Sequence, residues 1–134
     1  MAHISEALYS LLRGDEGVSM LAGDRIRRLV IDPKETTPFV QLQLIGLVPE
    51  ITLSGGHPLH TAAVEVSAWA DDYDTARALT EALRAAMDDF VNGAVAEVSI
   101  THILQIDEEE QGVELAADRV LVRILQTYEI QYRS

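Results

Sequence analysis

Residues 64–79 read VEVSAWADDYDTARAL, and within this stretch an alternating pattern gives way to a helical one. The small and apolar residues of the first half share one face of a strand: Val64, Val66, Ala68 and Ala70. Asp71 or Asp72 can then cap a helix. The apolar residues that follow recur at helical spacing: Ala76, Leu79, Leu83, Met87 and Phe90. The stretch predicts a strand followed by the longest helix, which Asn92 and Gly93 end and which lies across the sheet.

Two short helices are expected before any strand. The apolar residues of the first have one-face spacing: Ile4, Leu8, Leu11 and Leu12. Ser5 is placed to cap this helix and Gly14 to end it. Asp15 can cap a second short helix that stops at Gly23, and residues 24–37 then predict an extended connector, with prolines near its end.

Three further strands are expected from alternation. One spans Val40 to Leu44, one runs from Val98 to Ile106 with His102 on its apolar face, and the last runs from Val120 to Tyr132. Residues 107–112 between the last two read as a polar hairpin loop. The prediction is a single α+β domain over residues 1–134, with an antiparallel or mixed four-stranded sheet, helices mainly on one face, and the order ααββαββ.

The amino-acid composition excludes several classes of protein. The chain has 134 residues, 48% of them hydrophobic, which suits one folded domain with its own core. It contains no cysteine, so it has no disulfide framework, thiolate nucleophile or zinc ribbon. The first residues lack a basic flank and include Glu6, unlike a secretion signal, and no apolar run approaches the ~20 residues of a membrane span. The lack of cysteine favours a cytoplasmic compartment.

The net charge of −12 is concentrated after residue 34, where seventeen acidic residues face five basic ones. Such a surface repels phosphate backbones and argues against ordinary nucleic-acid binding. Arg25, Arg27 and Arg28 form the single basic cluster, which is most simply a solvated or ion-paired segment. The acidic run Asp107, Glu108, Glu109 and Glu110 is either a solvated loop or an assembly contact.

No catalytic signature is present. His57 and His60 are the one close histidine pair, but Pro58 between them indicates a loop and not a metal-binding helix face. His102 reads as a hydrogen-bonded core histidine. The aspartates at 71, 72 and 74 are explained by capping, since the residues after them do not continue a calcium loop. Gly55 and Gly56 lack the lysine of a phosphate-binding loop. We expect no catalytic residues, no metal and no cofactor.

Several segments in a fixed order resemble the tail terminator or tail completion proteins of long-tailed phages, a head–tail joining family also found in prophages and gene transfer agents. The segments are the helical opening closed by Gly23-Asp24-Arg25-Ile26, the strand entry Thr37-Pro38-Phe39-Val40, the strand-to-helix run of residues 68–79, and two long C-terminal strands. The resemblance covers nearly the whole chain.

The resemblance implies a structural protein without catalysis. It would form a ring, a hexamer, that caps the tail tube, ends its polymerisation and meets the head connector or stopper protein at the head–tail junction of the virion. DNA would pass through the lumen without specific binding, and acidic walls would disfavour phosphate adsorption. The family pattern is not followed at Arg27-Arg28 or in the acidic stretch of residues 107–118. Because such segments would meet neighbouring proteins, these departures concern the contacts with partners.

One hypothesis for the ring is charge pairing, in which Arg25, Arg27 and Arg28 of one subunit meet the acidic run of the next. An alternative function is a small ligand-binding or regulatory α+β domain, which a pocket with converging polar groups between helix 72–91 and the sheet would favour. A hydrolase or metal-dependent enzyme is the weakest alternative, because neither partner residues nor a motif support it.

Overall fold

The computed structural model describes the whole chain except residues 1–3, 50–58, 89–92, 96–97, 117 and 134. The described residues form three helices and six strands in the order ααβββαβββ. The elements are α1 (Ile4–Gly14), α2 (Glu16–Ala22), β1 (Ile26–Arg28), β2 (Phe39–Pro49), β3 (Leu59–Ala70), α3 (Tyr73–Asp88), β4 (Gly93–Val95), β5 (Val98–Ala116) and β6 (Arg119–Arg133).

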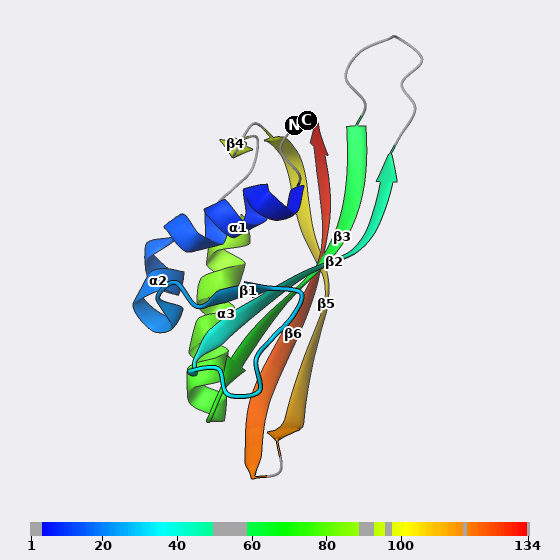
Figure 1. Ribbon diagram of the computed structural model, residues 1–134. Helices are drawn as coiled ribbons and strands as arrows, with labels where there is room; N and C mark the ends of the chain where they lie inside the picture. Colours follow the sequence, from blue (N-terminus) through cyan, green and yellow to red (C-terminus); the bar gives the residue numbers. More distant parts are fainter. Residues whose placement is uncertain (1–3, 50–58, 89–92, 96–97, 117, 134) are drawn as a thin grey trace.

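The strands make one mixed sheet in the order β1-β2-β3-β6-β5-β4. β1 runs parallel to β2, and the other neighbours are antiparallel. Figure 1 shows the helices gathered on one side of this strongly twisted sheet, with the β2–β3 and β5–β6 hairpins extending in opposite directions beyond them. The predicted α+β class and the helices on one face are confirmed. The four strands predicted are β2, β3, β5 and β6, and the three-residue strands β1 and β4 were missed because so short a segment carries no periodicity.

Local capping chemistry explains where the helices begin and end. The Asp15 side chain accepts a hydrogen bond from the backbone N–H of Val18 at 3.0 Å, so it is the N-cap of α2, as predicted. Gly23 ends α2 with a positive φ of 60°, a conformation that favours glycine. Asp72 accepts from the backbone N–H of Thr75 at 2.8 Å and caps α3. Ser5 lies inside α1 and not at its start.

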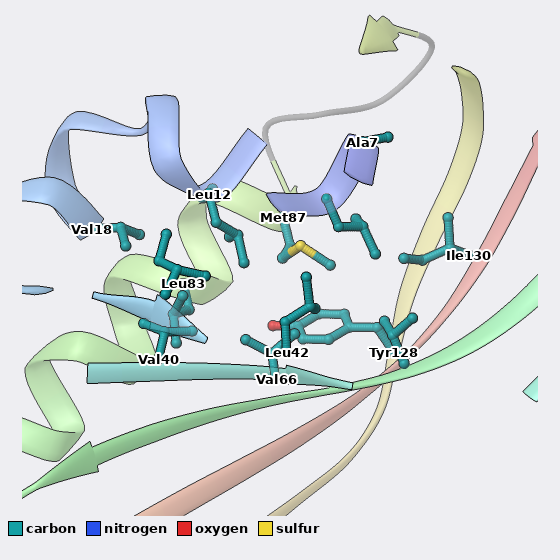
Figure 2. Packing of buried hydrophobic residues seen from close by; sticks show 14 of the residues in the cluster. Ala7, Leu12, Val18, Val40, Leu42, Val66, Leu83, Met87, Tyr128 and Ile130 are labelled. Carbon is teal, nitrogen blue, oxygen red and sulfur yellow. The ribbon is translucent and has the colours of Figure 1, made fainter. Parts of the chain in front are cut away.

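The main core lies between the helices and the sheet. Figure 2 shows Met87 of α3 beside the ring of Tyr128 of β6, with Leu42 and Val66 of the sheet close by. The predicted stripe of α3 is buried at Ala76, Leu79, Leu83 and Met87. The strand face of Val64, Val66, Ala68 and Ala70 is buried as predicted, because it is the face that the helices cover.

A second, smaller core covers part of the other face of the sheet. Trp69 and Phe39 stack there with ring centroids 5.7 Å apart, and Leu121 is buried against them. Ile31, from the connector between β1 and β2, packs onto this group. The connector predicted from the broken pattern therefore has a structural role, since it closes this outer core.

The prediction for β5 needs a correction. Residues 107–112 are not a hairpin loop but part of the 19-residue strand Val98–Ala116. The register of β5 against β6 shifts at three places, between Ile100 and His102, between Gln105 and Asp107, and between Glu114 and Ala116. Each bulge adds a residue and so exchanges the two faces of the strand. His102 is consequently exposed and not a core histidine, and Leu104 and Ile106 are exposed as well.

Candidate interaction surfaces

Strand alternation divides the acidic run in two. Glu108 pairs with Gln126 and Glu110 with Ile124, both buried residues of the helix-covered face. Residues directly opposite each other point to the same face. Glu108 and Glu110 therefore face the helices, whereas Asp107 and Glu109 face the other side of the sheet. The four carboxylates predicted as one loop surface belong to two surfaces.

Arg77 of α3 forms ion pairs with the two carboxylates that face the helices, Glu108 and Glu110. Its guanidinium donates to Glu108 Oε2 at 3.1 Å and forms a short contact with Glu110 Oε2. The Tyr73 hydroxyl also donates to Glu110 Oε2, at 2.6 Å. The hydrogen bonds from Tyr73 and Arg77 lower the pKa of Glu110, and the hydrogen bond to Glu110 raises the pKa of Arg77. The result is a charged brace between the start of α3 and β5.

The brace continues into the core. Gln126 Nε2 donates to Glu108 Oε1 at 3.2 Å, and Gln126 Oε1 accepts from the Tyr128 hydroxyl at 3.0 Å. Both Gln126 and Tyr128 are fully buried, and burial raises the pKa of Tyr128. A hydrogen-bonded row thus runs from Tyr128 through Gln126 and Glu108 to Arg77. The sequence offered one signal for it, a polar Gln126 on the apolar face of β6.

The predicted basic residues are engaged within the subunit. Arg27 makes two hydrogen bonds to the Glu35 carboxylate, each 2.9 Å long. Arg25 donates to the Pro38 carbonyl at 2.9 Å, and the Arg28 guanidinium lies 4.7 Å from the centroid of the Tyr9 ring. Arg28 is exposed, and no carboxylate of the described residues lies within ion-pair distance of it.

The connector is fixed to the β5–β6 hairpin. Arg119 of β6 donates to the carbonyls of Pro33 at 2.7 Å and Glu35 at 2.6 Å. The hydrogen bond from Arg27 lowers the pKa of Glu35 despite its partial burial. These contacts of Arg27 and Arg119 hold the segment between β1 and β2 against the outer core and so determine the conformation of that segment.

An apolar tip projects where β1 ends. Leu29 has a φ of 71°, a left-handed conformation unusual for a bulky side chain, and it is 59% exposed. Val30 beside it is 75% exposed. The strained turn is held by the Leu29 N–H donating to the Leu42 carbonyl at 2.9 Å and by Gln41 Nε2 donating to the Leu29 carbonyl at 2.8 Å. We call Leu29 and Val30 the apolar tip; no pattern in the sequence singled it out.

An open hollow of about 250 Å³ lies near the other edge of the sheet. Its lining comes from α3, β5 and β6: Tyr73, Glu110, Gln111, Gly112 and Val122. Gly112 leaves it open, because a Cβ built at this glycine meets no atom within 4 Å. The hollow thus lies between the start of α3 and the sheet, where the ligand-binding alternative expects a pocket. Its polar groups do not favour that alternative, because its one carboxylate, Glu110, is already paired with Arg77 and Tyr73.

The other histidines and aspartates considered as catalytic or metal-binding residues lie at separate places in the described structure. His60 lies on β3 with its ring 5.1 Å from that of Tyr132, while His57 lies outside the described residues. Asp72 serves as a helix cap, and Asp71 accepts a hydrogen bond from the Thr37 hydroxyl at 2.8 Å. In the part of the chain that the structure describes, no three histidine, aspartate or glutamate side chains converge as a metal site. None of the described helices combines the length and apolarity needed to cross a bilayer.

A family model and a solved structure are similar to the chain. The family model for tail completion protein gp17 matches residues 6–130. In structure, the chain is similar to a chain of the virion of a native gene transfer agent particle, with a TM-score of 0.69 and 17% sequence identity over 98% of this chain and 95% of that one. No curated protein sequence matches.

Proposed function

Because the chain belongs to the tail completion protein gp17 family, whose model spans residues 6–130, we propose that it forms a ring that ends the tail tube and joins the tail to the head connector. Membership of the family gives the protein a structural role in a phage tail. The match over almost the whole chain is the observation that carries the proposal.

In the proposed assembly a hexamer of this chain sits at the head–tail junction, after assembly in the host cytoplasm. One face of the ring contacts the tail tube protein and the other contacts the connector or stopper protein. The protein acts without catalysis, metal or cofactor. The carboxylates that Arg77 does not hold, Asp107 and Glu109, support an acidic surface that DNA passes without adsorbing.

The charge-pairing hypothesis remains a proposal in a narrower form. Arg27 and Glu110 each have a partner in their own subunit, so exchanging them between subunits would sacrifice an existing contact. Among the residues predicted for this pairing, Arg28 and the outward pair Asp107 and Glu109 are the charges that a neighbouring subunit can engage without that loss. Charge reversal at Arg28 should therefore weaken the oligomer at low salt. Charge reversal at Arg27 should weaken the oligomer less, once the lost stability of the Arg27 variant itself is taken into account.

Tail assembly without this chain tests the proposal. Cells that express the remaining tail and head genes should produce tubes longer than normal and heads without tails, and adding the purified chain should restore normal length and joining. Tube lengths are measured by negative-stain electron microscopy. A matched control uses the Leu83→Asp variant, which places a charge in the core and should not restore either property. Tails of normal length, joined to heads in the absence of the chain, would refute the proposal.

A further inference from the structure

The apolar tip and the hollow lie at opposite edges of the sheet. The tip follows β1, the first strand in the sheet order. The hollow is lined by β5 and β6, and β4 covers β5 at residues 98–100 alone, so β5 is an edge strand beside the hollow. Two different surfaces at opposite edges of one chain suit a head-to-tail contact between identical subunits.

Strand register places the two surfaces at different levels of the sheet. Paired residues lead from Ile26 to Val40, then to Ala68, Ile124 and finally Glu110 on the rim of the hollow. Leu29 lies three residues from this row in one direction and Gly112 two residues from it in the other, so tip and hollow are offset by about 17 Å along a strand. Tip and hollow can therefore meet in a closed ring if the strands are inclined to the ring axis, because an axis along the strands would turn this offset into the rise of a helical filament.

The charges around the two surfaces are complementary. Arg27 and Arg28 precede the tip directly in sequence, and Arg28 has no carboxylate partner among the described residues. The exposed Asp72 and Asp74 flank Tyr73 beside the hollow, and neither forms an ion pair among the described residues, whereas Glu110 on the rim is held by Arg77. Opposite charges around an apolar contact favour one partner and one orientation.

The backbone of the tip adds an independent observation. Leu29 keeps a strained conformation that glycine or asparagine would adopt more easily, and it exposes its side chain there. The strain is maintained from the sheet, since Gln41 donates to the Leu29 carbonyl and itself accepts from Trp69 Nε1 at 3.2 Å. A strained residue held in place by its surroundings is typical of a functional contact.

From these observations we infer that the tip of Leu29 and Val30 inserts into the hollow around Gly112 of a second copy of this chain. The contact rests on the proposed ring and specifies its interface. It repeats around the ring, with each subunit giving its tip to one neighbour and its hollow to the other. The tyrosine and valine of the hollow, Tyr73 and Val122, receive the apolar side chains, and Asp72 and Asp74 beside the hollow face Arg28.

Two substitutions test the contact without harming the fold. Leu29→Asn removes the apolar side chain and relieves the strained backbone. Gly112→Leu fills the hollow, where a Cβ at this position meets no atom of its own subunit within 4 Å. Each variant should unfold at the wild-type temperature or above it, and each should raise the dissociation constant of the oligomer at least about tenfold. Native mass spectrometry over a range of concentrations, alone and with isolated tail tubes, measures assembly.

Matched controls keep the interpretation specific. Met20→Ser removes an exposed apolar side chain from α2, and Gly46→Leu adds the same side chain as Gly112→Leu at another open strand position. Both controls should assemble as the wild type does. Mixing Leu29→Asn with Gly112→Leu should give complexes of one chain of each kind but no rings, because one tip and one hollow remain intact between them.

Cross-linking supplies a second measurement. The chain has no cysteine, so a Val30→Cys, Gln111→Cys variant can cross-link through these two positions alone. Under oxidation this variant should give a series of cross-linked products larger than the dimer, as a head-to-tail ring requires. Products that stop at the dimer, or rings that both Leu29→Asn and Gly112→Leu still form, would overturn this contact and leave the ring itself standing. A wild-type chain that stays monomeric alone and on tail tubes would overturn both.

Discussion

At the scale of single residues, hydrogen bonds to carboxylates tie the stability of the protein to pH. Glu35 accepts two hydrogen bonds from Arg27, which lower its pKa in the folded chain. A carboxylate whose pKa falls on folding stabilises the fold above its unfolded pKa, about 4.3 for glutamate. This contribution is lost as pH falls through the lower pKa of the folded state.

We predict that Glu35→Gln lowers the free energy of unfolding at neutral pH and that its difference from the wild type shrinks below about pH 4. The reason is that acid protonates Glu35 and makes the wild type resemble the variant. Denaturant titrations at several pH values measure this. Glu114→Gln, the same change at an exposed position, is the control. A difference that stays constant down to pH about 2 would contradict the assignment.

The buried pair of Gln126 and Tyr128 should be energetically coupled. Gln126→Leu leaves the Tyr128 hydroxyl buried without its acceptor and should cost about 1–3 kcal/mol of unfolding free energy. Tyr128→Phe removes the donor as well, so the double variant should be less destabilised than the sum of the single changes. Chemical denaturation of the four proteins gives the coupling energy, and simple additivity would show that the hydrogen bond does not form.

At the scale of elements, bulges and alternation determine what β5 presents. The bulge near Thr101 moves Ile103 onto the helix-covered face and leaves His102 and Leu104 on the other. A second bulge precedes the acidic run, which then alternates between Arg77 and the outer face. Carboxylates and bulges along an edge strand also discourage indiscriminate strand pairing. One strand thus provides both an internal brace and an external charged surface.

This alternation predicts unequal effects from equal changes of charge. Glu108→Gln with Glu110→Gln should lower the thermal midpoint, because Arg77 loses both ionised partners on β5. Asp107→Asn with Glu109→Gln neutralises two charges as well but should leave the midpoint unchanged or raise it. Differential scanning calorimetry at neutral pH compares the pairs. Similar midpoints for the two would argue against the Arg77 brace.

At the scale of the whole molecule, a net charge of −12 on 134 residues places many like charges close together. Self-repulsion of this kind destabilises a compact state and is weakened by salt. The described ion pairs are few and mostly near the surface, and salt weakens surface pairs too, though each contributes little. Relief of the repulsion should therefore dominate the effect of salt.

We accordingly predict that raising sodium chloride from about 0.02 to 0.2 M increases the thermal midpoint, as the screening length falls from roughly 20 to 7 Å. A triple variant with Asp107→Asn, Glu109→Gln and Glu114→Gln removes three of the twelve excess negative charges. Its thermal midpoint should rise less with salt than that of the wild type. Thermal melts followed by circular dichroism provide the comparison. A midpoint that falls with salt would mean that ion pairing outweighs repulsion.

The sequence by itself determined the features that depend on neighbours along the chain. The strand and helix of residues 64–88, the cap at Asp15 and the turn at Gly23 follow from periodicity and local hydrogen bonding, which need no distant contact. The sequence also carried the resemblance to tail completion proteins, which the family match over residues 6–130 confirmed.

Tertiary structure alone decided the rest. The bulges in β5 are set by pairing with β6, so no alternation in the sequence revealed that His102 is exposed or that the acidic run is a strand. The hollow around Gly112 is assembled from three elements, and the strain at Leu29 is maintained by Gln41 from β2. Surfaces of this kind arise from strand register and packing between segments distant in the sequence, which local patterns do not encode.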